Sequence, residues 1–399
     1  MSREAITLRV CKVKMNLDQL FKIELTALEE AHLRRTLRAT DQLPEGTLNF
    51  AANDYLGLST HPALIQAAQD ASAKYGTGAG ASRLVTGTNS AVLALEEELA
   101  AWKEKEAALV FSSGYAAALG TIPAVVGKGD TVILDKLAHA SLIDAARLSG
   151  ATVRVFPHNQ IEKLETLLKK ISSVPDRGRI LIVTESIFSM DGDAAPLHEL
   201  VDLKERHGAW LLVDEAHATA LYGTTGAGLL AELGLSTRVE IVMGTLSKGL
   251  GSVGGYIAGS RTLVDWLTNR ARSFVFSTGL PPGVIAASHA AVKIAQSAEG
   301  TSLRHRLREN ISRFHAGLPV VWKNKALSQS AIQPLICGEA STSLQLAAEL
   351  REKAFLIPAI RYPTVPRNAA RLRITLSAAH SDKKINALLE ALAALSSRP

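Results

Sequence analysis

The clearest pattern along the chain is a series of short apolar runs that alternate with amphipathic stretches between residues 90 and 260. The apolar runs occupy residues 107–111, 131–135, 152–156, 179–185, 209–215 and 239–245. Apolar positions at helical spacing fill 90–104, 141–148 and 197–207 between them. Strands without in-out alternation are buried on both faces, so the pattern predicts an α/β fold with a mostly parallel central sheet.

The pattern changes on either side of this region. Residues 17–39 have apolar positions at helical spacing and predict an N-terminal helix with Arg34, Arg35 and Arg38, the last two on a solvated face. After Pro281 and Pro282, a helix over 283–297 leads into strands near 331–337, 355–361 and 371–377 and a closing helix over 382–396. We therefore expect an N-terminal extension and helix (1–50), a large domain (51–282) and a smaller C-terminal α+β domain (283–399).

Composition limits the class of protein. The 399 residues are 47% apolar and 21% charged, which is typical of a globular protein with a sizeable core. No apolar run reaches the roughly 18 residues of a membrane span, so no membrane association is expected. Two distant cysteines, Cys11 and Cys337, favour a reduced, cytoplasmic protein without a metal site. Residues 1–14 precede the ordinary helical pattern that Met15 opens, and are expected to be an extension or a misplaced start.

The net charge of +6 suggests which partners to expect. A positive surface would attract an anionic substrate, such as a thioester of coenzyme A or of an acidic carrier protein. The chain has no dense basic block interleaved with aromatic residues, so binding to nucleic acid is not expected.

Polar side chains follow the apolar runs at the edge of the sheet where ligands usually bind. Lys248 follows the run 239–245 within Thr245-Leu-Ser-Lys. Its amine could condense with an aldehyde, and the hydroxyls of Thr245 and Ser247 could bond a phosphate. The run 209–215 contains Asp214, which could hold a proton on a pyridine nitrogen, and His217 follows it closely.

Three other interpretations of these motifs are disfavoured. One Asp and one His are too few ligands for a metal site. The Asp-Glu-Ala-His run of residues 214–217 resembles a helicase box, but residues 127–129 do not complete the phosphate loop that a helicase needs. Residues 249–254 match G-x-G-x-x-G, but strand and turn residues follow where a dinucleotide site needs a helix.

Two further segments complete the candidate site. Ser112-Ser-Gly114-Tyr115 follows the run 107–111 and precedes an alanine-rich helix, whose first amide groups could bind an anion. His139 follows the run 131–135 and could stack on a planar ring. Together these groups suit a phosphorylated, planar, nitrogen-bearing aldehyde.

The same segments carry a resemblance to a known family. From about residue 20 to the C-terminus the chain resembles the α-oxoamine synthases, which are fold-type I pyridoxal-phosphate transferases. The matching motifs are residues 49–58, 78–87, 135–141, 185–192, 214–217 and 245–248. The resemblance implies that the cofactor is pyridoxal 5'-phosphate, that the large domain binds it, and that the protein is a homodimer.

Residues 244–248, 359–366 and 371–375 are most similar to the biotin-pathway branch of the family. This implies decarboxylative condensation of L-alanine with a pimeloyl thioester, of coenzyme A or acyl carrier protein, to 8-amino-7-oxononanoate. Tyr362, Ala218 and the pair 367–368 differ from that branch, so glycine C-acetyltransferase and 5-aminolevulinate synthase stay as alternatives. A non-catalytic homologue would be expected to lose Lys248, which is present.

The resemblance also implies roles for single residues. Lys248 matches the Schiff-base lysine and proton carrier, Asp214 the acid that keeps the pyridine nitrogen protonated, and His139 the stacking histidine. His217 and Ser189 match groups near the ring oxygen.

The remaining matches are contacts to cofactor or substrate. Other implied cofactor contacts are Gly114, Tyr115, Glu185 and Thr245, and Ser277 and Thr278 from across the dimer interface. The implied substrate contacts are Arg34, Asn53, Thr364 and Arg373, of which Arg373 would hold the amino-acid carboxylate in two-point geometry.

Overall fold

The contacts of the chain divide it into two compact units. The computed structural model describes residues 15–323 and 328–396. The small unit comprises Met1–Leu48 and Leu335–Arg373, and the large unit comprises Asn49–Pro334 and Ile374–Pro399. The expected division into 1–50, 51–282 and 283–399 stays a prediction, and these contacts group residues 283–334 with the large unit. The expectations for residues 1–14, Cys11 included, lie outside the described residues.

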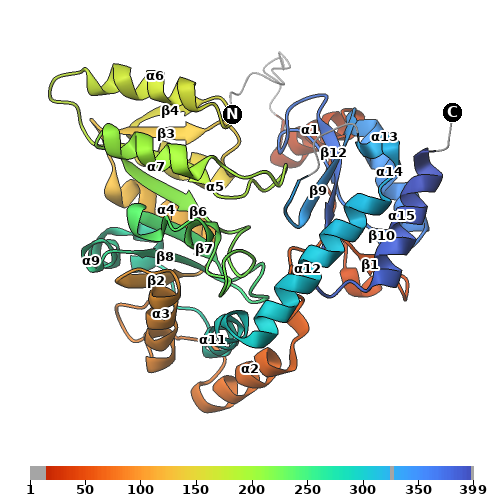
Figure 1. Ribbon diagram of the computed structural model, residues 1–399, viewed down its shortest axis with the longest axis horizontal. Helices are drawn as coiled ribbons and strands as arrows, with labels where there is room; N and C mark the ends of the chain where they lie inside the picture. Colours follow the sequence, from red (N-terminus) through yellow and green to blue (C-terminus); the bar gives the residue numbers. More distant parts are fainter. Residues whose placement is uncertain (1–14, 324–327, 397–399) are drawn as a thin grey trace. The chain divides into compact units, whose positions relative to one another are not determined.

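A seven-stranded sheet forms the centre of the large unit (Figure 1). Its strands are β2 (Ala107–Phe111), β3 (Thr131–Asp135), β4 (Thr152–Phe156), β5 (Ile180–Glu185), β6 (Trp210–Asp214), β7 (Ile241–Thr245) and β8 (Gly255–Gly259). The order is β2-β8-β7-β6-β5-β3-β4, and β8 runs antiparallel to both of its neighbours. The remaining pairs are parallel, so the predicted mostly parallel sheet is confirmed.

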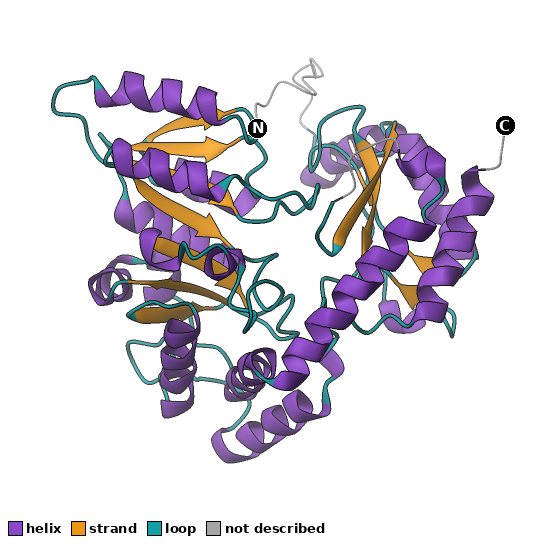
Figure 2. Cartoon of the chain, viewed as in Figure 1, coloured by secondary structure: helices purple, strands orange, loops and turns teal. Residues whose placement is uncertain are grey.

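Helices cover both faces of this sheet (Figure 2). The buried apolar side chains of α4 (Gly114–Val125), α5 (Ala140–Leu148), α9 (Arg261–Arg270) and α10 (Arg272–Val275) share one core cluster with the strands. Helix α7 (Leu197–Arg206) lies in front of the strands in Figure 1, and α6 (Ile161–Ser172) contacts α7 and the edge strand β4. Strands β2, β5, β7 and β8 are buried along their whole length, as expected for a sheet covered on both sides.

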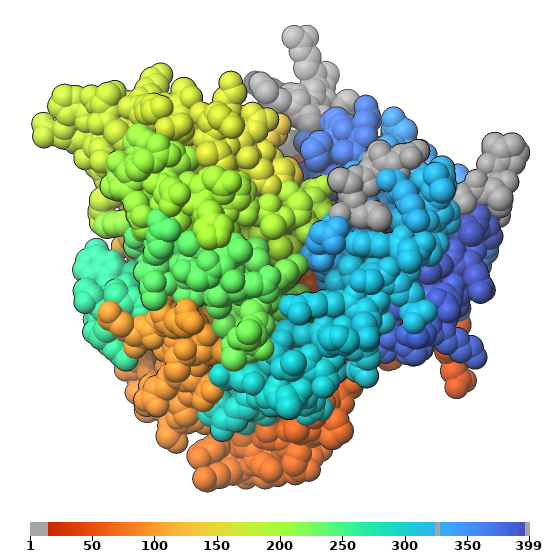
Figure 3. All heavy atoms as spheres, in the orientation of Figure 1, coloured from red at the N-terminus to blue at the C-terminus, as the bar shows by residue number. Residues whose placement is uncertain are grey.

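The rest of the large unit is helical. Helix α2 (Pro62–Tyr75) packs along α11 (Pro282–Gln296), which also contacts α3 (Ser90–Trp102). The surface of α2 is orange and that of α11 and α12 blue-green in Figure 3. The other elements are α8 (Leu229–Glu232), α12 (Ala298–Gly317), α13 (Val320–Lys323), α15 (Asp382–Ser396), η2 (Leu58–Thr60) and η3 (Ser236–Arg238). The sequence interpretation did not foresee α12. None of the helices in the described residues is long and apolar enough to cross a membrane.

The small unit combines short strands with two longer helices. It contains α1 (Leu17–Glu30), η1 (Thr40–Gln42), α14 (Ala340–Glu352), β10 (Phe355–Leu356) and β11 (Ala359–Ile360), and the chain crosses the boundary between units in β1 (Leu48–Asn49), β9 (Ile332–Gly338) and β12 (Ala370–Thr375). Strand β11 pairs antiparallel with β12. The single strand expected over 355–361 is therefore wrong. Pro358, which has no N–H group, lies at the break, and its carbonyl accepts from Arg373 N at 3.1 Å.

The N-terminal helix is shorter than predicted. Helix α1 ends at Glu30, because His32 adopts a left-handed conformation (φ 56°) and Leu28 O accepts from the amides of Leu33 and Arg34. The arginines at 34, 35 and 38 therefore follow the helix. Arg35 is exposed, as expected, and its Nη2 also lies 3.0 Å from Thr364 Oγ1.

Candidate active site

Three neighbouring strands end in polar residues that are almost completely buried. Glu185, Asp214 and Thr245 close β5, β6 and β7 and are 1%, 5% and 6% exposed. Glu185 and Asp214 lie opposite each other in the parallel pairing of β5 with β6. The carboxyl ends of the strands thus bring together Glu185, Asp214 and Thr245, which the sequence placed at this edge of the sheet.

A hydrogen-bonded series of side chains leads to Lys248. Its Nζ lies 2.8 Å from His217 Nε2, and His217 Nδ1 lies 2.5 Å from the hydroxyl of Tyr55. That hydroxyl is also 3.2 Å from Asn53 Oδ1. Three of these four residues were predicted, but Tyr55 was missed. Its position within the motif 49–58, two residues after Asn53, was the available signal.

A tight loop between β7 and β8 presents Lys248. Gly251 N donates to Lys248 O at 2.9 Å, and the Thr245 hydroxyl donates to Gly254 O at 2.8 Å. A Cβ on Gly251 would lie 2.4 Å from the backbone nitrogen of Ser59, so glycine allows this close approach. Since β8 follows directly, the glycine pattern does not open a helix, as predicted.

The phosphate role expected for Thr245 and Ser247 stays a prediction. Both hydroxyls are engaged within the loop, where Ser247 Oγ lies 3.2 Å from Gly254 O.

Burial dominates the electrostatics of the two carboxyl groups. It raises the pKa of Asp214, an effect that the nearby ammonium of Lys248 opposes. Burial and the adjacent Asp214 raise the pKa of Glu185 well above its usual value. Glu185 accepts from the amides of His139 and Ser189, yet its buried Oε1 has no hydrogen-bond partner among the described residues. Oε1 of Glu185 could therefore form a hydrogen bond with a bound molecule.

His139 lies at the start of α5 and caps it. Its Nδ1 accepts from the amide of Ser141 at 3.2 Å and lies 2.8 Å from that residue's hydroxyl. Burial lowers the pKa of His139, although Asp214 acts in the opposite direction. A neutral imidazole presents an uncharged ring, which is compatible with the stacking role that the resemblance implies.

A third histidine, His158, was missed by the sequence interpretation. Its Nδ1 lies 2.9 Å from Asp135 Oδ1 and its Nε2 lies 2.8 Å from Asp193 Oδ2. Asp135 also accepts from the amides of Leu137 and Asn159. This clamp ties together the loops that follow β3, β4 and β5, and two of these loops carry His139 and Ser189. In the sequence, the only signal for this cluster was Asp135 at the end of the run 131–135.

The segment after β2 forms a helix start, as predicted. The side chain of Ser113 caps α4 by accepting from the amide of Ala116 at 3.0 Å. A Cβ on Gly114 would make only ordinary contacts with Thr245, so space alone does not demand glycine there. Tyr115 is 44% exposed and its hydroxyl donates to Asp144 at 2.7 Å.

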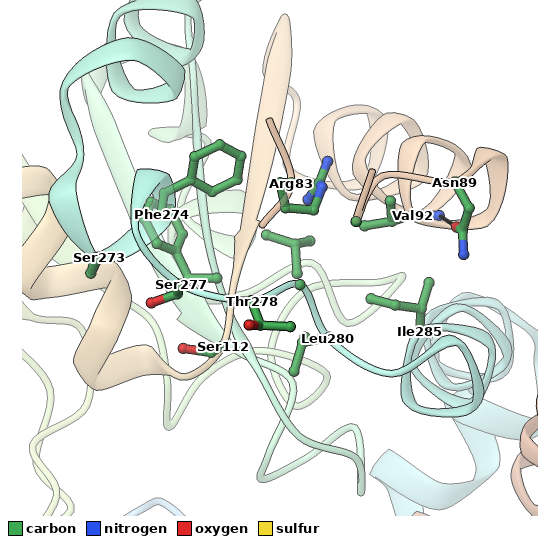
Figure 4. A pocket seen from close by; sticks show the side chains of 14 residues that line it. Arg83, Asn89, Val92, Ser112, Ser273, Phe274, Ser277, Thr278, Leu280 and Ile285 are labelled. Atoms are coloured by element: carbon green, nitrogen blue, oxygen red, sulfur yellow. Dashed lines mark hydrogen bonds between the residues drawn. The ribbon is translucent and has the colours of Figure 1, made fainter. Parts of the chain in front are cut away.

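Ser277 and Thr278 line a small cavity of about 20 Å³ together with Ser112 of the same chain. Figure 4 shows the three hydroxyl groups near one another at one end of this cavity. The Phe276–Gly279 loop is joined to the preceding 81–87 loop by a bridge between Ser82 and Thr278. Contact with a neighbouring chain's cofactor stays a prediction for both residues.

The expected substrate contacts are divided between the units. Asn53 lies in the large unit, whereas Arg34, Thr364 and Arg373 lie in the small unit. Arg34 pairs with Glu29 of the preceding helix α1, and the hydroxyl of Thr364 accepts from Arg35. Their roles toward substrate stay predictions.

Comparisons with known proteins agree with this architecture. The family model described as aminotransferase class I and II matches residues 45–392. A protein of Geobacter sulfurreducens described as 8-amino-7-oxononanoate synthase is 45% identical over 93% of this chain and 96% of its own length.

Two solved structures are also similar. A serine palmitoyltransferase from S. paucimobilis with bound pyridoxal phosphate and myriocin has a TM-score of 0.87 at 28% identity, over 95% of this chain and 98% of that one. An 8-amino-7-oxononanoate synthase from Francisella tularensis has a TM-score of 0.72 at 27% identity, over 88% and 98%. The expected fold-type I transferase fold is thereby confirmed. The chain belongs to the aminotransferase class I and II family, and its curated relatives include proteins described as 8-amino-7-oxononanoate synthases.

Proposed function

We propose that this protein condenses L-alanine with a pimeloyl thioester, with loss of carbon dioxide and the thiol, to give 8-amino-7-oxononanoate for biotin biosynthesis. The observation that carries the proposal is the Lys248–His217 contact beside buried Asp214, in a chain 45% identical to a relative described as that synthase. An amine, an imidazole and a buried carboxyl group at one sheet edge are the groups that this chemistry needs.

The residues at this edge fit pyridoxal 5'-phosphate. The cofactor supplies an electron-withdrawing ring that makes negative charge at the amino acid's α-carbon tolerable. Asp214 would face the ring nitrogen and His139 would stack on the ring. Oε1 of Glu185, which has no hydrogen-bond partner among the described residues, could form a hydrogen bond beside them. The amides at the start of α4 would face the phosphate.

The chain's own residues divide the remaining work. Lys248 would carry the proton to and from the α-carbon of L-alanine, because its amine stands on a loop at the strand ends. His217 would orient that amine, being held in turn by the Tyr55 hydroxyl. Arg373 would bind the alanine carboxylate through two parallel hydrogen bonds, which a guanidinium can make and an ammonium cannot.

A thiol-release assay on the purified holoenzyme tests the proposal. L-alanine, glycine and L-serine are each paired with pimeloyl, acetyl, succinyl and palmitoyl thioesters, carried by coenzyme A and by acyl carrier protein. The highest kcat/KM is expected for L-alanine with a pimeloyl thioester, and the product is identified by mass. A preference for glycine with an acetyl or succinyl thioester would instead support a sister enzyme of the same family.

We further propose that the working protein is a cytoplasmic homodimer. Two adjacent loops, 81–87 and 276–279, carry exposed apolar side chains. The exposed fractions are 74% for Val85, 52% for Leu84 and 71% for Phe276. The loops are joined by the Ser82–Thr278 bridge and by a hydrogen bond from Gly279 N to Ala81 O. Apolar patches of this kind favour a protein partner, and a second copy would cover them.

A further inference from the structure

A buried ion pair adjoins Asp214. Lys103 follows α3 and is 2% exposed, and its Nζ lies 3.0 Å from Oε2 of Glu215, which is 1% exposed. Glu215 is the residue directly after Asp214. Its other carboxylate oxygen accepts from the amide of Leu230 at 2.9 Å. Both carboxylate oxygens are therefore engaged, and the side chain that follows Asp214 is held in one position.

The surroundings of Lys103 leave little freedom. Its ammonium donates to the carbonyl of Ala227 and to the hydroxyl of Thr219 at 3.1 Å. That hydroxyl lies 2.8 Å from the hydroxyl of Tyr256 on β8, whose ring centroid is 5.6 Å from Lys103 Nζ. A Cβ on Gly228 would lie 2.2 Å from Glu215 Oε2, so packing closes the cluster on that side.

A gain in stability does not by itself explain why the Lys103–Glu215 ion pair is buried. Two charges lose their hydration on burial, and apolar residues of similar volume often stabilise a protein as well or better. Glu215 is one of three carboxyl groups at the ends of β5 and β6, beside Glu185 and Asp214. Although burial alone would lower the pKa of Lys103, Glu215 raises it above its ordinary value, so the ammonium stays charged.

The groups that act on Asp214 come from several elements. They are Glu215 after β6, His139 before α5 and Lys248 after β7. Lys248 and His139 favour the charged carboxylate, whereas Glu215 opposes it. Asp214 in turn raises the pKa of Glu185 on the neighbouring strand β5. An ammonium that neutralises Glu215 therefore shifts this balance toward ionised Asp214.

We propose that Lys103 is a positioning residue, which neutralises Glu215 and so keeps Asp214 negatively charged and aimed at the ring nitrogen of the cofactor. The inference rests on the proposed function, because it concerns the cofactor that Asp214 would hold. Lys103 touches no reacting atom and acts through Glu215 alone.

The test follows the visible absorption of the bound cofactor from about pH 6 to pH 10. The variants are Lys103→Met, Glu215→Gln and the double variant. Lys103→Met removes the positive charge and should raise the midpoint of the change in cofactor absorption by about one pH unit. Glu215→Gln removes a negative charge and should lower that midpoint. The double variant, in which both charges are absent, should return to the wild-type midpoint. The dissociation constant of pyridoxal phosphate is measured in parallel and should rise about tenfold in Lys103→Met and recover in the double variant.

Lys204→Met is the matched control. Lys204 is also buried, at 6% exposed, and its Nζ lies 2.6 Å from Glu240, which precedes β7 at the opposite end of the sheet. This variant loses the ion pair between a buried lysine and the partly exposed Glu240 without changing the charge near Asp214, so neither readout should move.

The outcomes separate the inference from the proposed function. A wild-type protein without cofactor absorption would overturn the proposed function. Cofactor absorption with unmoved midpoint and affinity in the folded variants would overturn only the role of Lys103. A double variant as defective as Lys103→Met, or an equal effect of Lys204→Met, would also overturn it. If Lys103→Met does not fold, the downward shift in Glu215→Gln decides.

Discussion

Lys248 is the residue on which the proposed chemistry depends most directly. It is half-buried on a loop, so replacing it removes little packing. We expect Lys248→Ala to keep its melting temperature and to lose turnover by more than about 1,000-fold, since it removes both the nucleophile and the proton carrier. Borohydride reduction followed by peptide mapping should place the cofactor's mass on Lys248 in the wild type.

Lys136→Ala is the control, because Lys136 is exposed directly after β3, another strand of the same sheet. Its turnover should match that of the wild type. A folded Lys248→Ala protein with a tenth or more of wild-type turnover, where about 1,000-fold loss is expected, would contradict the assigned role.

Asp214→Asn separates charge from shape at a second residue. Asp214 Oδ1 accepts from the amide of Ala216 at 2.9 Å, and an asparagine oxygen can accept the same bond, so the turn should survive. Loss of the negative charge should slow the exchange of the α-proton of L-alanine about 100-fold or more. Proton NMR in heavy water without thioester measures this step alone. Exchange at the wild-type rate in folded Asp214→Asn would show that the aspartate only caps the turn.

His158 gives the large unit a stability that depends on pH. Burial alone would lower its pKa, but hydrogen bonds to Asp135 and Asp193 raise the pKa to about 10. An unfolded histidine has a pKa near 6.5, so the stabilisation is complete below about pH 6.5 and is lost as the pH rises toward 10. Partial exposure of Asp193 weakens the effect, and we expect about 2 kcal/mol.

Urea unfolding at about pH 6.5 and pH 9.5 measures this contribution. The free energy of unfolding should fall between these pH values in the wild type, and by less in His158→Gln. His305→Gln, at an exposed position on α12, is the control and should follow the wild type. Equal pH dependence of wild type and His158→Gln would refute the clamp.

At the scale of elements, the loop between β7 and β8 depends on a close approach of two backbone segments. Gly251 has φ 62°, and a Cβ there would meet the backbone of Leu58 and Ser59. We expect Gly251→Ala to destabilise the protein by about 2 kcal/mol or more and to reduce kcat by displacing Lys248.

The matched control is Gly150→Ala. Gly150 has φ 73°, but no atom lies within 4 Å of the position of its Cβ, so only the backbone strain remains. Its loss of stability should be smaller, with kcat unchanged. Equal losses in the two variants would mean that the contact with residues 58–59 does not hold the loop.

Elements also show how far the sequence could predict this protein. Apolar runs predict strands well because burial on both faces leaves few other arrangements, and the polar residues after them converge because parallel strands end at one edge. Helix ends are less visible: His32 closes α1 through a left-handed conformation that the apolar spacing does not reveal. A charged residue beside a helix end, such as Lys103, is expected to be solvated, and its partner Glu215 is 112 residues away. Buried polar contacts of this range need the fold to be known.

At the scale of the whole molecule, we expect two chains to build each site. Ser277 and Thr278 line a cavity with Ser112 of their own chain, yet exposed Phe276 beside them favours a partner. Sedimentation should give twice the mass of the chain, and dilution should reduce turnover if each site uses two chains.

Mixing two inactive variants decides between these arrangements. Lys248→Ala lacks the amine, and Ser277→Ala combined with Thr278→Val lacks the hydroxyls expected to bind the phosphate. If the hydroxyls act across the interface, a mixed dimer has one site with both defects and one intact site, so about a quarter of all sites regain activity after random exchange of chains. If they act within their own chain, every site keeps a defect and the mixture stays as inactive as its parts. Assays at limiting pyridoxal phosphate keep the hydroxyl variant from being rescued by excess cofactor. Recovery is the result we expect, because two adjacent loops that expose Phe276 and Val85 next to two hydroxyls are poorly suited to face water.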